Sequence, residues 1–378
     1  MTRALPCLLT LLVLGACASA PVREPPAPLV EFKPDVAIRE VWSARVGGET
    51  KDWVGLVPKI SDGTLYVAGP QGQVHALVLE SGRSVWQTEL KDKIGGAVGI
   101  GEGLVLLGTR RGEVIALDRT SGKLVWRAPV SSEVLAAPAA GGGVVVVQTV
   151  DGRLFGLSAT DGKRLWVDQR TEPALSLRGT SVPMIAGAVV VAGFANGKLA
   201  ALDLHSGRAR WEATVGQPRG RNEIERLVDV DAASLIMTDA IYASSYQGRL
   251  VALNPVNGSI GWSRDVSSYT GIAGDGNNVY VTDAAGRVLA FDRRTGASLW
   301  KQEALRGRSL NAPVVYRDYV VVADYQGYVH WLARADGRFV ARHQAGSDPV
   351  RAPAMTDGDL LLVLGQSGNL VAVRPDPK

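Results

Sequence analysis

Cysteine has the most nucleophilic of the common side chains, and this sequence of 378 residues contains only two, Cys7 and Cys17. Both lie within the first twenty residues. The remainder of the sequence therefore has no disulfide, no thiolate metal site and no cysteine nucleophile. A thiol close to an N-terminus can instead be an attachment point for lipid. The thiol chemistry of this sequence thus concerns its N-terminus.

Histidine could also carry acid–base or metal chemistry, and the sequence has four: His75, His205, His330 and His343. His75 and His330 occupy the same place in a repeated unit, three residues after a glycine. The other copies have Ile115, Phe155, Ala200, Val251, Leu289 and Val371 there. This place indicates packing within the repeat. A metal site needs clustered ligands with further supporting groups, and the sequence indicates none.

Aspartate recurs at Asp118, Asp203 and Asp292, six residues after the repeated glycine and just before a turn. There we expect it to accept hydrogen bonds from nearby backbone amides. Lysine and arginine number 41 against 37 acidic residues, and the charges are interspersed, which argues against nucleic-acid binding. We therefore expect no metal, no cofactor and no nucleic-acid partner.

The N-terminus has the pattern of an export signal. It has a charged start at Arg3, an apolar run over residues 8–14 and small residues after it. The run is too short for an ordinary transmembrane helix. Leu14-Gly15-Ala16-Cys17 is similar to the bacterial lipobox, in which the cysteine is lipidated and becomes the first mature residue. A plain signal cleaved after Ala18-Ser19-Ala20 is the alternative, but the cysteine directly follows Leu-Gly-Ala, which favours lipidation.

The same resemblance implies an outer-membrane location. Lipoproteins of this type carry several acyl chains, which anchor stably. The residue after Cys17 is Ala18 and not aspartate, which directs such proteins to the outer membrane, facing the periplasm. Five prolines within residues 18–35 favour an extended tether. The chain thus divides into a signal peptide (1–16), a lipidated cysteine with a Pro-rich tether (17–35) and one folded domain (36–376).

A unit of about forty residues repeats along the folded domain. Each copy has a glycine, and most have a tryptophan fourteen residues later. The glycines are Gly72, Gly112, Gly152, Gly197, Gly248, Gly286, Gly327 and Gly368, and the tryptophans are Trp86, Trp126, Trp166, Trp211, Trp262 and Trp300. Apolar runs between tight turns make four strands per copy. The sequence predicts an all-β fold, an eight-bladed β-propeller of four-stranded antiparallel blades.

The two ends of the repeat predict how the ring closes. The last copy ends at Lys378 before its tryptophan strand, and the folded domain begins with a strand that contains Trp42. We expect this N-terminal strand to join the last blade. The seventh copy has Ala341 in place of tryptophan. One tryptophan at a fixed place favours packing between blades over its alternative, ligand stacking.

Two connections are longer than the others, residues 171–181 and 216–234, and both follow a tryptophan strand. By the symmetry of the repeat they should be neighbours on one rim. The first contains Leu175, Leu177 and Arg178, and the second contains arginines and glutamates followed by Asp229 and Asp231. Apolar anchors with a charged rim favour a protein-binding patch. The leucines could equally tuck beneath their own loop, and the residues alone leave both interpretations open.

Three segments resemble the BamB family, the propeller lipoproteins of the bacterial outer-membrane β-barrel assembly (BAM) machinery: LSLRGTSVP (175–183), IERLVDVD (224–231) and GYVHWLARADGRFVAR (327–342). The resemblance covers essentially the whole mature chain. It implies an eight-bladed propeller that binds the periplasmic POTRA domains of BamA. The matching contact residues are Leu175, Leu177, Arg178, Asp229 and Asp231. The sequence departs mildly from the family pattern at residues 228 and 232–234, which bears on the conformation of the second loop.

The resemblance also implies a non-enzymatic scaffold, which works with BamA and the other BAM subunits and helps to position unfolded outer-membrane proteins. The same repeats resemble pyrroloquinoline-quinone dehydrogenases, which stack the quinone on an aromatic floor, bind Ca²⁺ and use an aspartate base. This chain is much shorter and has no mature cysteine besides Cys17, whereas many of those enzymes have a cysteine pair. We therefore favour the scaffold. A periplasmic propeller that binds peptides at strand edges is a third interpretation, compatible with the scaffold.

We expect Cys17→Ser to release the protein from membranes and to leave it folded, because the acyl chains supply the anchor. The measurement is fractionation of cells depleted of BamA. Cys7→Ser, inside the signal, is the control and should stay with the membranes. A Cys17→Ser protein that still fractionates with membranes in those cells would contradict lipidation.

Overall fold

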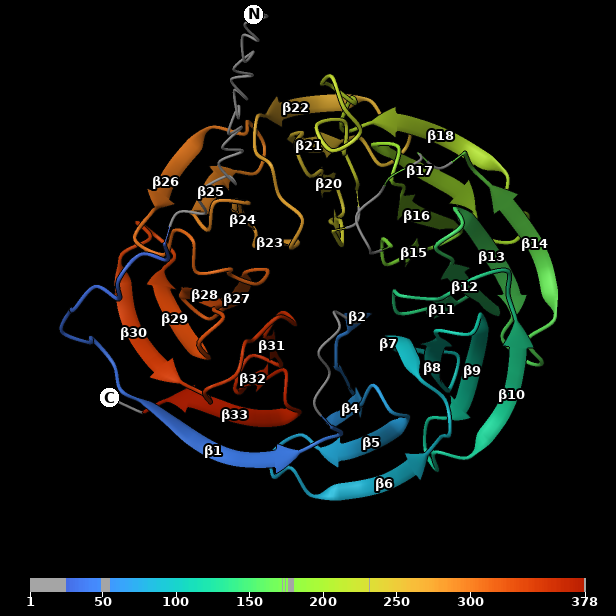
Figure 1. Ribbon diagram of the computed structural model, residues 1–378, viewed down its shortest axis with the longest axis horizontal. Coiled ribbons are helices and arrows are strands. Elements are labelled where there is room, and N and C mark those ends of the chain that lie inside the picture. The colour runs from blue at the N-terminus through green and yellow to red at the C-terminus, as the bar shows by residue number, and fades with distance from the viewer. Residues whose placement is uncertain are drawn as a thin grey trace, which may run out of the picture.

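The computed structural model describes residues 25–48, 55–171, 173, 175, 180–230 and 232–376. These residues form eight small sheets that stand around a central axis like the blades of a propeller (Figure 1). The predicted all-β, eight-bladed propeller is confirmed. Within the described ranges, no helix is long and apolar enough to cross a membrane. Cys17 and the signal peptide lie outside the described residues.

The four main strands of each blade are antiparallel, and in blades 1 to 7 they follow chain order from the axis outward. Blade 1 has β3 (Lys59–Ser61), β4 (Thr64–Ala68), β5 (Gln73–Val78) and β6 (Ser84–Glu89). Blade 2 has β7 (Ile94–Gly101), β8 (Leu104–Thr109), β9 (Glu113–Asp118) and β10 (Leu124–Pro129). Blade 3 has β11 (Ala139–Gly141), β12 (Val144–Gln148), β13 (Arg153–Ser158) and β14 (Arg164–Gln169). Blade 4 has β15 (Met184–Ala186), β16 (Val189–Gly193), β17 (Lys198–Asp203) and β18 (Ala209–Thr214).

The second half of the ring follows the same plan. Blade 5 has β19 (Leu235–Ile236), β20 (Ile241–Ser244), β21 (Leu250–Leu253) and β22 (Ile260–Arg264). Blade 6 has β23 (Ile272–Gly274), β24 (Asn278–Thr282), β25 (Val288–Asp292) and β26 (Ser298–Gln302). Blade 7 has β27 (Val314–Tyr316), β28 (Tyr319–Ala323), β29 (Tyr328–Ala333) and β30 (Phe339–Gln344). Blade 8 has β31 (Met355–Thr356), β32 (Leu361–Leu364), β33 (Asn369–Pro375) and β1 (Ile38–Arg45).

Ring closure follows the prediction. β1 from the N-terminus pairs antiparallel with β33 from the C-terminus, and Trp42 lies opposite Ala372. One blade departs from the four-stranded plan, because the two-residue strand β2 (Gly55–Leu56) adds to blade 2 in parallel with β7. Blade 2 therefore has the four antiparallel strands of the other blades, with β2 as an addition next to the axis.

The burial of each strand matches its place in the blade. The second strand is buried on both faces, as in β12, where all five residues are buried. The outer strand alternates, as in β10, where only Trp126 and Ala128 are buried. This pattern is expected of a sheet sandwiched between neighbouring sheets and bounded by solvent at its outer edge.

The repeated tryptophans join neighbouring blades. Each indole N–H donates a hydrogen bond to a backbone carbonyl in the turn before the outer strand of the next blade. The seven pairs are Trp42 with Leu79, Trp86 with Arg119, Trp126 with Ala159, Trp166 with Leu204, Trp211 with Pro255, Trp262 with Arg293 and Trp300 with Arg334. We call each of these contacts a clasp. The interpretation of the tryptophans as packing between blades is confirmed.

A glycine completes each clasp. Gly122 has φ of +69° and lies against the ring of Trp86, where an added Cβ would come within 2.4 Å of the indole. The same turn therefore needs glycine for its backbone angle and for the close approach of the ring. Gly82, Gly162, Gly207, Gly258, Gly296 and Gly337 contact the preceding tryptophan in the same way.

In blade 7, the tryptophan and the alanine that lie opposite each other on the third and outer strands have exchanged places. In blade 2, Trp126 on the outer strand lies opposite Ala116. In blade 7, Ala341 on the outer strand lies opposite Trp331, which is fully buried. The exchange keeps the side-chain volume of the pair and so preserves packing. It also leaves the junction between blades 7 and 8 without a clasp.

The N-terminal segment from Pro25 to Val36 passes along the outside of blade 7 before it becomes β1 (Figure 1). The Phe32 ring stacks on Phe339 of β30 with 5.3 Å between ring centroids. The prolines predicted an extended tether, and the described part of that tether is extended. It is docked against the propeller.

We expect Gly122→Ala to destabilise the protein more than Gly63→Ala. Both glycines have φ of +69°, but an added Cβ meets nothing within 4 Å at Gly63 and the Trp86 ring at Gly122. The difference should be about 1–3 kcal/mol, the cost of overpacking, and is measured by urea unfolding. Equal losses of stability would show that the clasp tolerates a methyl group.

Candidate partner-binding face

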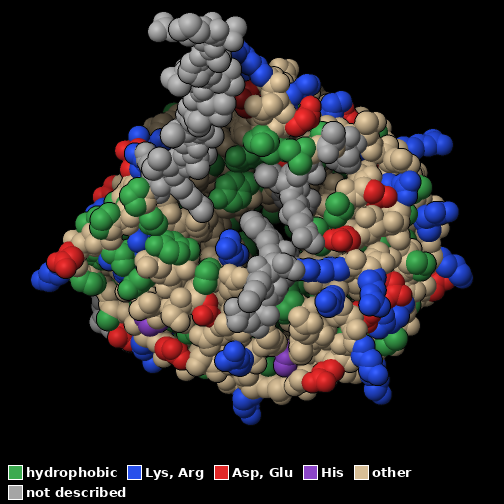
Figure 2. Space-filling view, in the orientation of Figure 1, with side chains coloured by type: hydrophobic (Ala, Val, Ile, Leu, Met, Phe, Trp, Pro, Cys, Tyr) green, Lys and Arg blue, Asp and Glu red, His purple; other side chains and the backbone are tan. Residues whose placement is uncertain are grey.

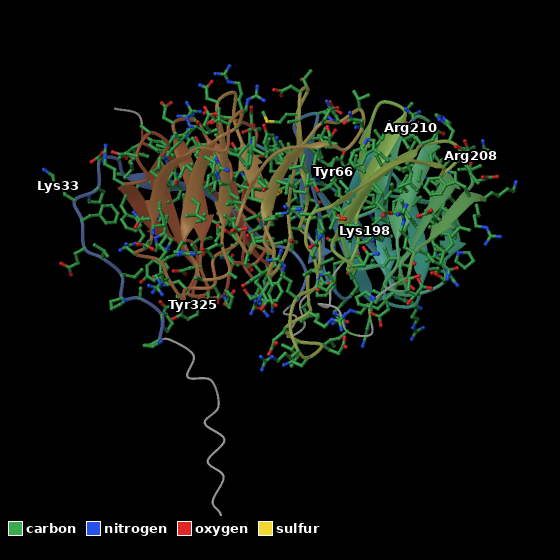
Figure 3. All side chains as sticks on the ribbon, turned by 90° about the horizontal axis from the view of Figure 1, so that it is seen from above. Lys33, Tyr66, Lys198, Arg208, Arg210 and Tyr325 are labelled. Atoms are coloured by element: carbon green, nitrogen blue, oxygen red, sulfur yellow. The ribbon has the colours of Figure 1, made fainter. Side chains whose placement is uncertain are left out.

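The two sides of the ring carry different connections. One side carries the turns with the repeated glycines and the connections between blades, and we call it the loop face. The two sets of turns touch, because a Cβ on Gly72 would lie 2.2 Å from the carbonyl oxygen of Leu90. The loop face is toward the viewer in Figure 1 and points down in Figure 3, where Tyr325 is labelled. We call the opposite side, which carries the clasps, the hairpin face.

Both long connections lie on the loop face and meet at one turn of blade 4. Asn196 donates a side-chain hydrogen bond of 3.4 Å to the carbonyl of Thr171, where the first connection begins. A Cβ on Gly197, the next residue, would lie 2.3 Å from the carbonyl oxygen of Gly216, where the second begins. The prediction that the two insertions are neighbours on one rim is confirmed for their described ends.

The first connection exposes its described leucine. Leu175 is 42% exposed, so it does not tuck beneath its own loop. Leu177 and Arg178, the other two residues singled out in this loop, lie outside the described residues.

The second connection projects from the loop face as a compact turn (Figure 3). The backbone amide of Glu225 donates to the side-chain oxygen of Asn222 at 2.9 Å, and the Glu225 carboxylate accepts from the amide of Arg221 at 2.7 Å. Asn222 Nδ2 also donates to the Glu225 carboxylate at 2.8 Å, so the turn is held by hydrogen bonds similar to those of a capping box. It presents Ile224, which is 67% exposed, at the tip. The sequence interpretation missed Ile224, although an isoleucine among charged residues was a visible signal.

Asp229 lies at the base of this second loop and not on its rim. It is only 1% exposed, and Val228 and Val230 beside it are also buried. Its carbonyl accepts from the amide of Tyr246 at 3.0 Å, and the amide of Val230 donates to the carbonyl of Phe194 at 3.3 Å. The expectation of a charged rim at Asp229 is therefore wrong, and the residue joins the loop to blades 4 and 5. Asp231 lies outside the described residues.

Aromatic side chains adjoin the second loop. Tyr246 and Tyr269 form an edge-to-face pair with centroids 6.1 Å apart. Gln247, next to Tyr246, donates a side-chain hydrogen bond to the carbonyl of Ile224. Figure 2, which views the loop face, shows hydrophobic side chains gathered over blades 5 and 6. In the sequence, these aromatic residues could have been noticed from Tyr246, which stands in the repeated glycine turn as Tyr-Gln-Gly at residues 246–248.

The residues that could do acid–base chemistry are dispersed or internally paired. His330 is fully buried, and its Nε2 lies 3.1 Å from Asp324 Oδ2, which also accepts from Arg308 Nε at 2.7 Å. Burial lowers the pKa of His330 below its ordinary value against the opposing pull of Asp324, so the ring is neutral at pH 7. No group of three metal-binding side chains occurs in the part of the chain that the structure describes.

The repeated aspartates cap turns, as the sequence predicted. Asp118 Oδ1 accepts from the amide of Ser121 at 2.8 Å, and Asp203 and Asp292 accept from the amides of Ser206 and Thr295 in the same way. The side-chain and backbone hydrogen bonds of Ser121 lower the pKa of Asp118. These carboxylates are committed to local structure.

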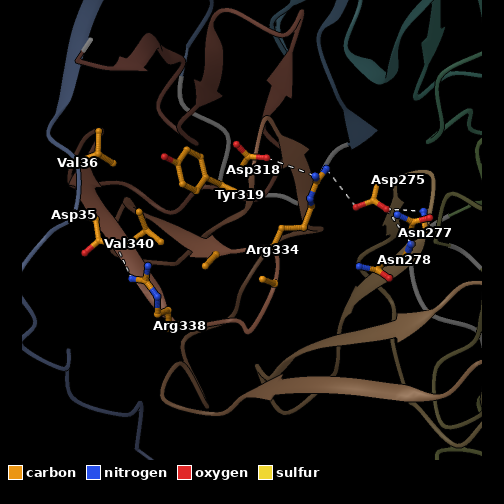
Figure 4. A pocket seen from close by; sticks show the side chains of 12 residues that line it. Asp35, Val36, Asp275, Asn277, Asn278, Asp318, Tyr319, Arg334, Arg338 and Val340 are labelled. Atoms are coloured by element: carbon orange, nitrogen blue, oxygen red, sulfur yellow. Dashed lines mark hydrogen bonds and ion pairs between the residues drawn. The ribbon is translucent and has the colours of Figure 1, made fainter. Parts of the chain in front are cut away.

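The hairpin face has a polar pocket of about 540 Å³ between blades 6 and 7 (Figure 4). Arg334 lies between Asp275 and Asp318, 3.5 Å from each, and Asp35 pairs with Arg338 at 2.6 Å. All five charged groups are held in ion pairs, and the three carboxylates exceed the two guanidiniums by one negative charge.

The sequence of this chain is similar to those of known proteins. A family model described as outer membrane protein assembly factor BamB matches residues 39–98 and 70–302, more than half of the chain. The chain belongs to the BamB family. BamB of Pseudomonas aeruginosa is 48% identical over 365 residues, 96% of each chain. BamB of Alkalilimnicola ehrlichii is 49% identical over 373 residues, 98% of this chain and 97% of the relative.

Solved structures extend this agreement to the fold. The crystal structure of BamB from Moraxella catarrhalis matches with a TM-score of 0.82 at 28% identity, over 89% of this chain and 100% of that one. A quinohemoprotein alcohol dehydrogenase from Comamonas testosteroni matches with a TM-score of 0.70 at 14% identity, over 89% of this chain and 76% of the enzyme. At that identity the likeness to the enzyme shows the propeller fold alone. The members of the BamB family named above are called assembly factors, a non-catalytic role.

Proposed function

We propose that this protein is a non-enzymatic scaffold of the outer-membrane β-barrel assembly machinery, anchored by lipid at Cys17 and facing the periplasm. It binds the POTRA domains of BamA through its loop face and so assists the insertion of β-barrel proteins. The observation that carries the proposal is the meeting of two long loops at one turn of blade 4, each with an exposed aliphatic side chain, Leu175 or Ile224.

The chemistry of these loops suits a protein partner. Leu175 and Ile224 provide apolar anchors, and exposed charged residues surround the second anchor: Arg219, Arg221, Glu223, Glu225 and Arg226. Apolar anchors that become buried on binding, within a polar rim, carry most of the affinity of typical protein interfaces. The partly buried Tyr246 and Tyr269 extend the apolar area toward blade 6.

Leu177, Arg178 and Asp231 complete the proposed contact set through the family resemblance. Asp229 contributes from beneath, because its burial at the loop base fixes where the second loop leaves the blade. The other subunits of the BAM machinery are partners of this protein within the same complex. Direct contact with unfolded outer-membrane proteins along exposed strand edges is compatible with this role.

We expect the double variant Leu175→Ala/Arg178→Ala to weaken binding to the BamA POTRA domains by roughly tenfold or more, because it removes an apolar anchor and a charge. Surface plasmon resonance on the purified protein measures the affinity, and the melting temperature should stay unchanged.

The matched control for this double variant is Val256→Ala/Arg294→Ala. It removes the same two kinds of side chain from turns of the hairpin face, where Val256 is 84% exposed. The control should bind BamA like the unaltered protein. Equal affinity of the two double variants would remove the first loop from the interface.

The enzyme alternative has a direct test. We expect no bound chromophore after addition of pyrroloquinoline quinone and Ca²⁺, because the buried His330 and Asp324 are occupied by Arg308 and by each other. Absorbance after gel filtration measures retention of the quinone. Stoichiometric retention would overturn the non-enzymatic assignment.

A further inference from the structure

The N-terminal segment 25–36, which we call the strap, is docked along the ring with one side partly buried. Ala27, Leu29, Phe32 and Val36 are partly buried, and the residues between them are exposed. Lys33 points away from the ring (Figure 3). A segment that hung free would not present one side to the protein in this way.

At the loop face, the strap is held by a buried arginine. The amide of Ala27 donates to the carbonyl of Arg306 at 2.9 Å, and Arg308 Nη1 donates to the carbonyl of Ala27 at 3.0 Å. The Arg308 side chain is buried and is held in turn by the buried Asp324. Because Arg308 is charged and is fixed by its ion pair with Asp324, it is a strong and well-oriented hydrogen-bond donor for the strap backbone.

At the middle of the strap, an aromatic contact takes over. Phe32 stacks on Phe339, and the guanidinium of Arg342 lies 5.0 Å from the Phe32 ring centroid. Arg342 Nε also donates to Nδ1 of His330 at 3.3 Å. The buried His330–Asp324–Arg308 network therefore links the contact at Phe32 to the contact at Ala27.

Toward the hairpin face, the strap ends in an ion pair. The carboxylate of Asp35 lies 2.6 Å from Arg338 Nη1, and the amide of Asp35 donates to the carbonyl of Val340 at 2.9 Å. Val36 then packs into the hydrophobic core shared by blades 7 and 8. This is the one junction without a tryptophan clasp in the described ring, and the strap joins the two blades there because it docks on blade 7 and continues into β1 of blade 8.

These contacts fix where the chain leaves the ring. Asp35 lies near the start of β30, which follows the hairpin-face turn at Gly337, and Ala27 lies beside Arg308 on the loop face. Traced toward the N-terminus, the chain therefore crosses from the hairpin face to the loop face. Only eight residue steps separate Pro25 from Cys17, which a fully extended chain spans in about 28 Å.

We propose that the strap orients the propeller at the membrane, with the loop face toward the phospholipid surface and the hairpin face toward the periplasm. The proposal rests on the lipid anchor of the proposed function. A free tether would give no preferred orientation, whereas a strap docked from Asp35 to Ala27 favours those in which the loop face is near the anchor. BamA bound at that face is then held between the propeller and the membrane.

The test measures energy transfer from a single fluorescent label to acceptor lipids, with the full lipidated protein in liposomes. The label is placed in blade 6 at Ala285→Cys on the loop face or at Arg294→Cys on the hairpin face, both exposed. The two sites are separated by the length of β25, about 17 Å. We expect roughly twofold higher transfer from the loop-face label. Equal transfer, or higher transfer from the hairpin face, overturns the proposal.

A strap variant sharpens the result. Phe32→Ala/Asp35→Ala removes the ring stack and the ion pair, and it should reduce the difference between the two labels. Val30→Ala/Glu31→Ala changes exposed strap residues and should retain the full difference. A full difference in the Phe32→Ala/Asp35→Ala protein would show that these contacts do not set the orientation.

Flotation with the liposomes separates this proposal from the one on which it rests. Protein that does not float contradicts the lipid anchor, and with it the orientation. Protein that floats but transfers energy equally from both faces contradicts the strap alone. Circular dichroism confirms that each variant is folded before the transfer is compared.

Discussion

The contact between the tryptophan of one blade and the glycine turn of the next is the interaction on which this propeller depends. A glycine at positive φ lets the indole approach the turn, and the indole N–H then satisfies a turn carbonyl, as with Trp86, Gly122 and Arg119. Seven such contacts lie toward the hairpin face. The loop face is therefore free of this constraint, and insertions of different length can grow there without disturbing the ring.

The fold was largely predictable because the repeat is long, regular and rich in turn residues. The exchange of Trp331 and Ala341 was visible in the sequence but was missed, since only the outer position of the pair was compared across copies. The docking of the tether was not predictable. Prolines report an extended backbone, but the partners that hold it, such as Arg308 and Arg338, lie some three hundred residues away. The short β2 carries too little pattern to be found.

The candidate site was predictable in place and less so in detail. The departures from the forty-residue period located both loops, and the exposure of Leu175 agrees with its expected role as an anchor. An aspartate in an insertion is expected at the surface, yet Asp229 is buried because Val228 and Val230 carry the base of the loop beneath the turn of blade 4. Such burial depends on contacts with Phe194 and Tyr246, which no local pattern reports.

The course of the strap also decides how the ring would respond to mechanical load. The strap runs antiparallel to β30, with Asp35 near Val340 and Ala27 beyond the far end of the strand. A pull on the N-terminus, away from the loop face, acts along the strap and slides it against β30. Contacts aligned with a pull share the force and yield together, whereas contacts arranged across it peel apart one by one. The strap therefore takes tension in shear before any of it reaches the pairing of β1 with β33 that closes the ring.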